Sequence, residues 1–167
     1  MLLMKRLFTI AFLLFACKLY AQNYTQDAGV RFGEYFTATY RHYQDNDQAL
    51  EGMLNLGKRG MTVGILKEYF QPLSGHVSDN LYFEYGFGAH VGFRSVYKYK
   101  ILNRTYVLDE NRVTPLLGIN GLVGLEYRFH EFPFVIGVDV KPYFEYSIIQ
   151  IFSMYLHSVG ISLKYKF

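Results

Sequence analysis

The chain has 167 residues, of which 51% are hydrophobic and 19% aromatic, and its formal net charge is +3. This length predicts one domain. The mean hydropathy is only +0.05, so apolar residues must be interleaved with polar ones, and long apolar runs are excluded outside the N-terminal segment.

Residues 1–21 have the pattern of a secretory signal peptide. Lys5 and Arg6 precede an apolar run over 7–16, and cleavage is expected after Ala21. The run falls well short of the ~20 apolar residues that a membrane-spanning helix needs. Lipoprotein processing at Cys17 is the alternative, although Phe15 is bulky for that signal.

Removal of residues 1–21 changes the charge and the cysteine content. Lys5, Arg6 and Lys18 leave, so Lys+Arg falls from 17 to 14 and equals the 14 Asp+Glu. The mature domain, residues 22–167, therefore has no basic excess, which argues against a nucleic-acid partner. The only cysteine leaves as well, which excludes an intramolecular disulfide and thiol chemistry.

Apolar and polar residues alternate from about residue 28 onward, which is the period of a β-strand. The first strand is expected over 29–41, where Glu34 breaks the alternation and predicts a β-bulge or a start near Tyr35. Strands follow over 49–56 and 61–70, and the second of these loses its register at Lys67.

The second half is patterned more regularly. The segment 81–94 carries apolar residues at every second position from Leu81 to Phe93, and further strands are expected over 96–107, 117–129, 134–146 and 155–167. The last strand has an almost wholly apolar face and a small or charged face. The apolar face holds Tyr155, His157, Val159, Ile161, Leu163, Tyr165 and Phe167, and the other holds Leu156, Ser158, Gly160, Ser162, Lys164 and Lys166.

These segments add up to eight strands joined by connections of alternating length. Short connections are expected at 57–60, 94–95 and 130–133, and longer polar ones at 42–48, 71–79, 108–113 and 147–154. Short turns on one side and longer loops on the other are typical of bacterial outer-membrane barrels. The short turns and both termini would lie in the periplasm. The predicted fold is all-β, an eight-stranded antiparallel up-and-down transmembrane β-barrel.

A soluble eight-stranded calyx would alternate as well, but the side chains favour the membrane barrel. The large aromatic face would overfill the interior of a barrel of this size, whereas glycines suit it. A closed barrel also leaves no backbone edge in the bilayer. Interfacial aromatic girdles are expected at Tyr40, Tyr97, Tyr99, Tyr127, Phe129, Tyr146, Tyr155, Tyr165 and Phe167.

The chain resembles the small outer-membrane barrels of the OmpA transmembrane domain and OmpX type, and more loosely the PorT-like barrels. The signal peptide ending Tyr20-Ala21-Gln22, the eight alternating segments and the terminal Lys164-Tyr165-Lys166-Phe167 carry this resemblance. It implies a β-signal in the last strand, read by the outer-membrane assembly machinery. It does not imply one activity, because such folds host adhesins, lipid-modifying enzymes and structural proteins.

No catalytic, cofactor-binding or metal-binding residue is predicted. A lipid-modifying enzyme would need a base beside a nucleophile, but the residue two positions after His157 is Val159, so His157 is interpreted as an interfacial residue near the outer rim. His42 with Asp45 and Asp47 is interpreted as a solvated loop, with a weak cation site as the alternative.

Charged residues gather on the predicted inner face. They are interpreted as a salt-bridged plug, with a proton relay or narrow channel as the alternative, because small barrels are filled by their side chains. Lys164 and Lys166 are expected to pair with lumenal carboxylates. The other residues are Glu84, His90, Arg94, Glu126, Arg128, Asp139, Lys141 and Glu145.

The sequence therefore predicts a non-enzymatic integral protein of the bacterial outer membrane, with a structural or surface-interaction role. The alternative is an accessory barrel of a secretion or surface-assembly system, as the PorT-like resemblance implies. A lipid A-modifying enzyme and a small pore are further alternatives. The expected partners are outer-membrane lipid and lipopolysaccharide, the assembly machinery through the C-terminal strand, and a protein bound by the extracellular loops. No cofactor is expected.

Overall fold

The computed structural model describes residues 25–167 except 58–59, 74–79, 102–103, 149–151 and 157, and it describes only the backbone over 96–112. The signal peptide predicted for residues 1–21, and His157, lie outside the described residues. Ten strands follow in the order β1 Gln26–Phe32, β2 Phe36–Asp45, β3 Gln48–Gly57, β4 Gly60–Pro72, β5 Leu81–Ile101, β6 Arg104–Arg128, β7 Phe134–Val140, β8 Tyr143–Ser147, β9 Ser153–Tyr155 and β10 Val159–Lys166.

The ten strands make an eight-stranded barrel, because two pairs of them are interrupted single strands. β7 and β8 both pair with β6 in one continuous register. The break between them falls at Pro142, which has no N–H to donate to the ladder. β9 and β10 form the last barrel strand, since β9 pairs with β8 and β10 with β7, although the register shifts by one residue between them.

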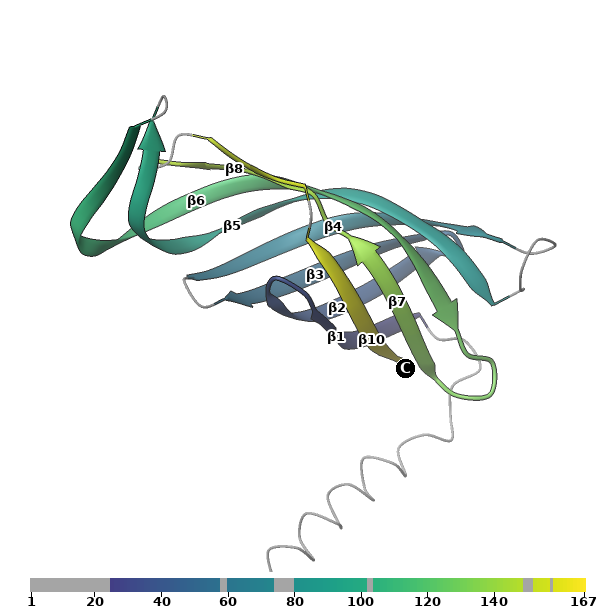
Figure 1. The fold of residues 1–167 in the computed structure, drawn as a ribbon. Coiled ribbons are helices and arrows are strands. Elements are labelled where there is room, and N and C mark those ends of the chain that lie inside the picture. The colour runs from purple at the N-terminus through teal and green to yellow at the C-terminus, as the bar shows by residue number, and fades with distance from the viewer. Residues whose placement is uncertain (1–24, 58–59, 74–79, 102–103, 149–151, 157) are drawn as a thin grey trace, which may run out of the picture.

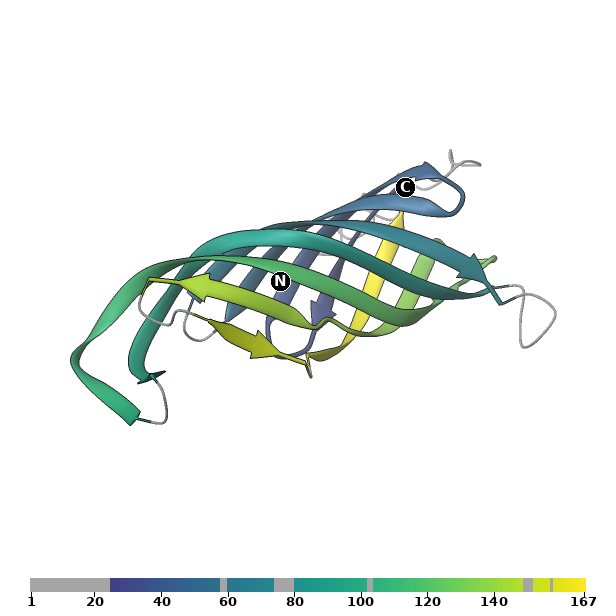
Figure 2. The ribbon, with the colours of Figure 1, turned by 90° about the horizontal axis from the view of Figure 1, so that it is seen from above.

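The sheet closes on itself through the two ends of the described chain. β1 pairs antiparallel with β10, from Asp27 opposite Lys166 to Phe32 opposite Ile161. Figures 1 and 2 show the resulting barrel from the side and from above. The predicted all-β, eight-stranded antiparallel fold is confirmed, including closure of the last strand on the first. Among the described residues, no helix is long and apolar enough to span a bilayer.

The predicted bounds of two strands were wrong. The segment 29–41 is a hairpin, β1 and β2, joined by the turn Gly33-Glu34-Tyr35. Conversely, 96–107 is not a separate strand. Residues up to Ile101 continue β5 and those from Arg104 begin β6, and the apparent break near Ser95 is a register irregularity between Val96 and Lys98. The two errors cancel in the strand count.

Because the turn at 33–35 was not predicted, several connections lie at the opposite end of the barrel from the predicted one. β2 and β4 end, and β3 and β5 begin, at the end of the termini, whereas β3 ends and β4 begins at the opposite end. The predicted connections at 94–95 and 108–113 are parts of β5 and β6. The connections near 130–133 and 147–154 lie at the predicted ends, because the second error restores the alternation.

The two faces of the barrel are inverted relative to those of a water-soluble domain. Among the described residues, buried polar and charged side chains outnumber buried hydrophobic ones, and large hydrophobic side chains on every barrel strand are exposed. Lys67 does not break the register of β4, since it stays on the outer face beside Gln44 and the ring of Tyr69. The outer surface is a continuous apolar band, as the alternation predicted.

Among the aromatic residues expected at strand ends, those with described side chains follow this band with one exception, and the side chains of Tyr97 and Tyr99 lie outside the description. Tyr40, Phe129, Tyr146 and Phe167 are exposed on the outer face, and Phe167 is in ring contact with Tyr165. Tyr155 instead turns inward and stacks on Tyr143, with ring centroids 4.8 Å apart. The alternation slips between Leu156, which is exposed, and Ser158, which is buried, so the predicted outer position of Tyr155 was wrong.

The β5–β6 hairpin projects beyond the barrel at the end away from the termini (Figure 1). The β4–β5 ladder stops at Gly60 opposite Arg94, and the β6–β8 ladder stops at Leu116 opposite Ser147. β5 and β6 continue to pair with each other as far as Ile101 opposite Arg104. This part, residues 95–101 and 104–115, is called the ribbon below.

Candidate functional site

The lumen holds the charged residues, and Arg41 lies at the centre of the largest group. Arg41 is fully buried on β2. Five carboxylates, each from a different strand, lie within 4 Å of its guanidinium. The shortest distances are 2.6 Å to Glu126 and 2.7 Å to Glu68. This group, called the Arg41 cluster, consists of Arg41, Asp27, Glu51, Glu68, Glu84 and Glu126.

Further cations compensate the carboxylates of the Arg41 cluster. Arg128 Nε donates to Glu126 at 2.7 Å. Glu51 lies 3.2 Å from Lys141 Nζ and 2.8 Å from Lys164 Nζ. Glu84 has a more distant partner, since its ion pair to Arg41 measures 3.8 Å. Buried charges are costly unless they are paired, so these contacts are what allows so many ionised groups inside the barrel.

Arg31 on β1 and Asp139 on β7 form a second ion pair beside the Arg41 cluster. Arg31 Nε donates to both carboxylate oxygens of Asp139, at 2.8 and 3.1 Å, and Arg31 Nη2 donates to the carbonyl oxygen of Ser158 at 2.7 Å. The guanidinium occupies the space that a side chain at Gly160 would need, with atoms 2.6 Å from the position of its missing Cβ. Glycine at 160 therefore makes room for a bidentate pair.

The end of the lumen away from the termini is closed by a separate group of polar residues, called the mouth cluster. Arg94 Nη2 donates to Glu145 at 2.8 Å and to the hydroxyl of Tyr35 at 2.9 Å. The ring nitrogens of His90 contact Asn120 and Glu145, the latter at 3.2 Å. Tyr143 donates to Glu34 at 3.0 Å. The cluster comprises Glu34, Tyr35, His90, Arg94, Tyr143 and Glu145.

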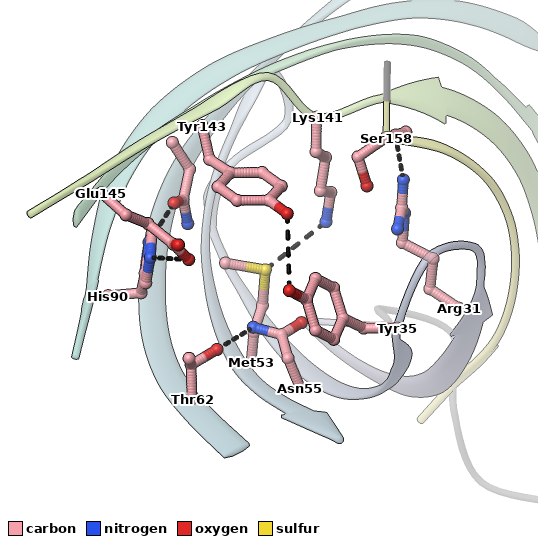
Figure 3. A pocket seen from close by; sticks show the side chains of 11 residues that line it. Arg31, Tyr35, Met53, Asn55, Thr62, His90, Lys141, Tyr143, Glu145 and Ser158 are labelled. Atoms are coloured by element: carbon pink, nitrogen blue, oxygen red, sulfur yellow. Dashed lines mark hydrogen bonds and ion pairs between the residues drawn. The ribbon is translucent and has the colours of Figure 1, made fainter. Parts of the chain in front are cut away.

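Tyr35 lines two cavities in this end of the barrel. Its ring lies against the Cα of Gly57, within 2.6 Å of where a Cβ would stand, so the turn folds over the opening. Below it, a cavity of about 40 Å³ lies between the two clusters and is lined by Arg31, Met53, Asn55, His90 and Lys141 among others (Figure 3). A second cavity of about 300 Å³, called the vestibule, lies beside the first, and Tyr35 and Thr62 line both.

All eight charged or histidine residues predicted on the inner face are there, at most partly exposed, and Lys164 pairs with a carboxylate as expected. Glu84, Glu126, Arg128 and Lys141 lie in or beside the Arg41 cluster, and His90, Arg94 and Glu145 lie in the mouth cluster. Asp139 pairs with Arg31. No ion pair joins Lys166 to a lumenal carboxylate among the described contacts. Sequence reasoning did not single out Arg41, Asp27 or Glu68, although Arg41 and Glu68 alternate with the outer residues Tyr40 and Lys67.

The described residues place no hydroxyl nucleophile on His90 and no cluster of metal ligands. No serine or threonine hydroxyl is hydrogen-bonded to His90, and no group of three or more potential ligands converges in the part of the chain that the structure describes. His42, Asp45 and Asp47 accordingly form no described metal site.

Comparison with known proteins identifies the fold. No family model and no curated protein sequence matches the chain. Its structure is similar to the crystal structure of the N-terminal β-barrel domain of OprF from Pseudomonas aeruginosa, with a TM-score of 0.55 and 13% sequence identity, over 85% of this chain and 95% of that one. The chain thus has an OmpA-like eight-stranded barrel fold, as its resemblance to that type implied. The looser resemblance to PorT-like barrels receives no support from these comparisons.

Proposed function

We propose that this protein is a non-enzymatic, integral protein of the bacterial outer membrane. The observation that carries this proposal is the inversion of the two faces around a closed ring: the outer face is apolar, and charged residues are buried inside. In a bilayer every backbone polar group must be paired internally, and a closed barrel meets this requirement along its ladders. The similarity to the OprF barrel domain supports the same assignment.

The lumen is proposed to be a plug and not a conducting path. The Arg41 cluster supports this, because Arg41 bridges carboxylates from strands on several sides of the barrel and leaves its own guanidinium fully buried. The interior of an eight-stranded barrel is just wide enough to be filled by side chains. The mouth cluster, which includes Tyr35, closes the other half of the lumen.

A structural and surface-interaction role follows from the ribbon. It extends from the end opposite the termini, which is the extracellular end if both termini lie in the periplasm. Beyond Arg94 and Leu116, its two long edges pair with no other strand of the described residues. Such edges are able to pair with another polypeptide, so the ribbon is the proposed contact surface for a protein partner.

Fractionation and bilayer recording test the proposal together. The protein should co-fractionate with lipopolysaccharide in the outer membrane, and the purified protein in planar bilayers should give no open-channel conductance steps. It should also release no fatty acid from lipopolysaccharide. Steady conductance steps would contradict the plug, acyl release would contradict the non-enzymatic role, and recovery in the soluble fraction would contradict the location.

A further inference from the structure

The barrel wall is incomplete at one place near the mouth. The β1–β10 ladder ends at Phe32 opposite Ile161, yet the last barrel strand continues through β9 to Ser153. Within the part of the chain that the structure describes, β9 pairs with β8 alone. Its other edge faces the space that β1 leaves when the chain turns at Gly33. We call this interruption, between β9 and the β1–β2 turn, the notch.

The notch lies in the apolar band of the outer surface. Phe32 and Phe36 are exposed on its β1–β2 side, and Met154 and Leu156 are exposed on its β9 side. Phe32 and Phe36 pack edge to face, with ring centroids 5.5 Å apart. Unpaired backbone groups in an apolar environment cost several kcal/mol each. The free edge of β9 therefore requires polar atoms from another source.

The vestibule meets the notch from the inside. Its described lining is Glu34, Tyr35, Gly60, Thr62, Phe93, Arg94 and Tyr155. Glu34 and Tyr35 belong to the turn on one side of the notch, and Tyr155 belongs to β9 on the other. The cavity of about 300 Å³ is large enough for a small ligand group.

The lining combines aromatic rings with two charged side chains. Arg94 is neutralised by two contacts with Glu145, whereas Glu34 stays exposed and accepts a hydrogen bond from the neutral Tyr143. Among the described lining residues, no unpaired cation is therefore available to select an anion. Rings pack against the C–H face of a sugar, and carboxylate, guanidinium and tyrosine hydroxyl groups hydrogen-bond to sugar hydroxyls. This chemistry fits a neutral polyhydroxylated group.

We propose that the vestibule and the notch bind one sugar-headed amphiphile. Its sugar occupies the vestibule between Tyr35 and Tyr155, its hydroxyls pair with the free edge of β9, and its alkyl chain leaves through the notch across Phe32 and Phe36. An added β-strand fits less well, because the free edge of β9 is only three residues long. The path of the chain rests on the proposed membrane insertion, whereas the sugar site rests on the cavity alone.

Solution NMR in micelles tests this proposal with dodecyl maltoside as the probe. The folded protein, held in dodecylphosphocholine, is titrated with dodecyl maltoside, which has the same alkyl chain and a different head. We expect saturable shifts of the Tyr35 and Tyr155 ring signals and intermolecular NOEs from the maltose ring protons to those rings. Shifts that are linear in detergent, or NOEs from the alkyl chain only, would overturn the proposal.

Two variants and one further ligand sharpen the test. Tyr155→Ala should weaken the saturable binding about three- to tenfold, the range expected from loss of one aromatic contact. Tyr146→Ala removes an exposed ring on the outer face, two residues after Phe144 on β8, and should leave binding unchanged. Equal binding by both variants would overturn the site. Free maltose that binds as tightly as dodecyl maltoside would overturn the role of the notch, while failure of membrane fractionation would affect only the proposed function.

Discussion

Arg94 donates a hydrogen bond to the hydroxyl of Tyr35 at 2.9 Å, and this contact crosses the mouth of the barrel. Arg94 lies on β5 and Tyr35 in the β1–β2 turn, with β2, β3 and β4 between them along the wall. Because Arg94 also holds Glu145 on β8, three separate parts of the wall are tied at one guanidinium. The turn is thereby fixed over the lumen.

Replacing Arg41 should destabilise the barrel strongly. In Arg41→Met, five buried carboxylates lose their common cation, and loss of one partner from a buried ion pair costs about 3–5 kcal/mol. Urea unfolding in detergent micelles or lipid vesicles, followed by the heat-modifiable shift on gels, measures this change. Lys67→Met, on the outer face, is the control and should lose no stability. An Arg41→Met barrel as stable as the parent would contradict the central role of Arg41.

The carboxylates of the cluster should contribute unequally. Glu126 lies 2.6 Å from Arg41 and 2.7 Å from Arg128, whereas the ion pair of Glu84 is 3.8 Å long. Glu126→Gln should therefore cost about 2–3 kcal/mol of unfolding free energy, the size of hydrogen bonds to charged groups. Glu84→Gln keeps the shape and should cost less than about 1 kcal/mol. The reverse order of the two losses would show that these distances do not govern the stability.

Opening the mouth should not create a channel. Tyr35→Ala removes the side chain between the vestibule and the inner cavity but leaves the Arg41 cluster intact at the other end. Single-channel recording of both proteins in planar bilayers should show no conductance steps. Steps that appear in Tyr35→Ala alone would mean that Tyr35, and not the Arg41 cluster, closes the lumen.

Two glycines on opposite faces should respond differently to alanine. A Cβ at Gly118 would lie 2.5 Å from His90 Nε2 and from the carbonyl oxygen of Phe144, so Gly118→Ala should destabilise by about 1–3 kcal/mol through overpacking. A Cβ at Gly52, on the outer face, would have the Tyr40 carbonyl oxygen as its nearest neighbour, at 3.8 Å. Gly52→Ala is the matched control and should leave the unfolding free energy almost unchanged. Similar losses for both variants would contradict the argument from steric crowding at Gly118.

The orientation in the membrane can be tested with single cysteines, since the predicted mature chain contains none. Val113→Cys, at the base of the ribbon, should react with a membrane-impermeant maleimide in intact cells. Phe132→Cys, in the connection at the end of the termini, should react only after the cells are opened. Both positions are well exposed in the structure. Inverted labelling would place the ribbon in the periplasm.

The faces of the barrel could be predicted from the sequence, but some of its turns could not. Phe32 and Phe36 are four positions apart and both face outward, so the three-residue turn between them leaves the alternation intact except at Glu34. Near Ser95 the opposite occurs. The irregularity between Val96 and Lys98 shifts the alternation inside a continuous hairpin and therefore imitates a turn. Period-two patterns report which face a residue is on and not where the chain reverses.

The ion pairs themselves depend on information that alternation lacks. Arg41 meets Glu126 because the register of every intervening ladder brings them to the same height inside the barrel. A shift of any one ladder would change the partner without changing the pattern of either strand. The sequence could therefore predict a charged lumen, but not the choice of Arg41 as its centre.

The pairing of β1 with β10 also sets the order in which the molecule can assemble. The two strands that seal the barrel come from opposite ends of the described chain, as Asp27 opposite Lys166 shows. Contacts of such high sequence separation form late and slowly, so until synthesis of the last strand is complete, β1 keeps an unpaired, aggregation-prone edge. Closure of β1 on β10 is therefore the expected last step of folding.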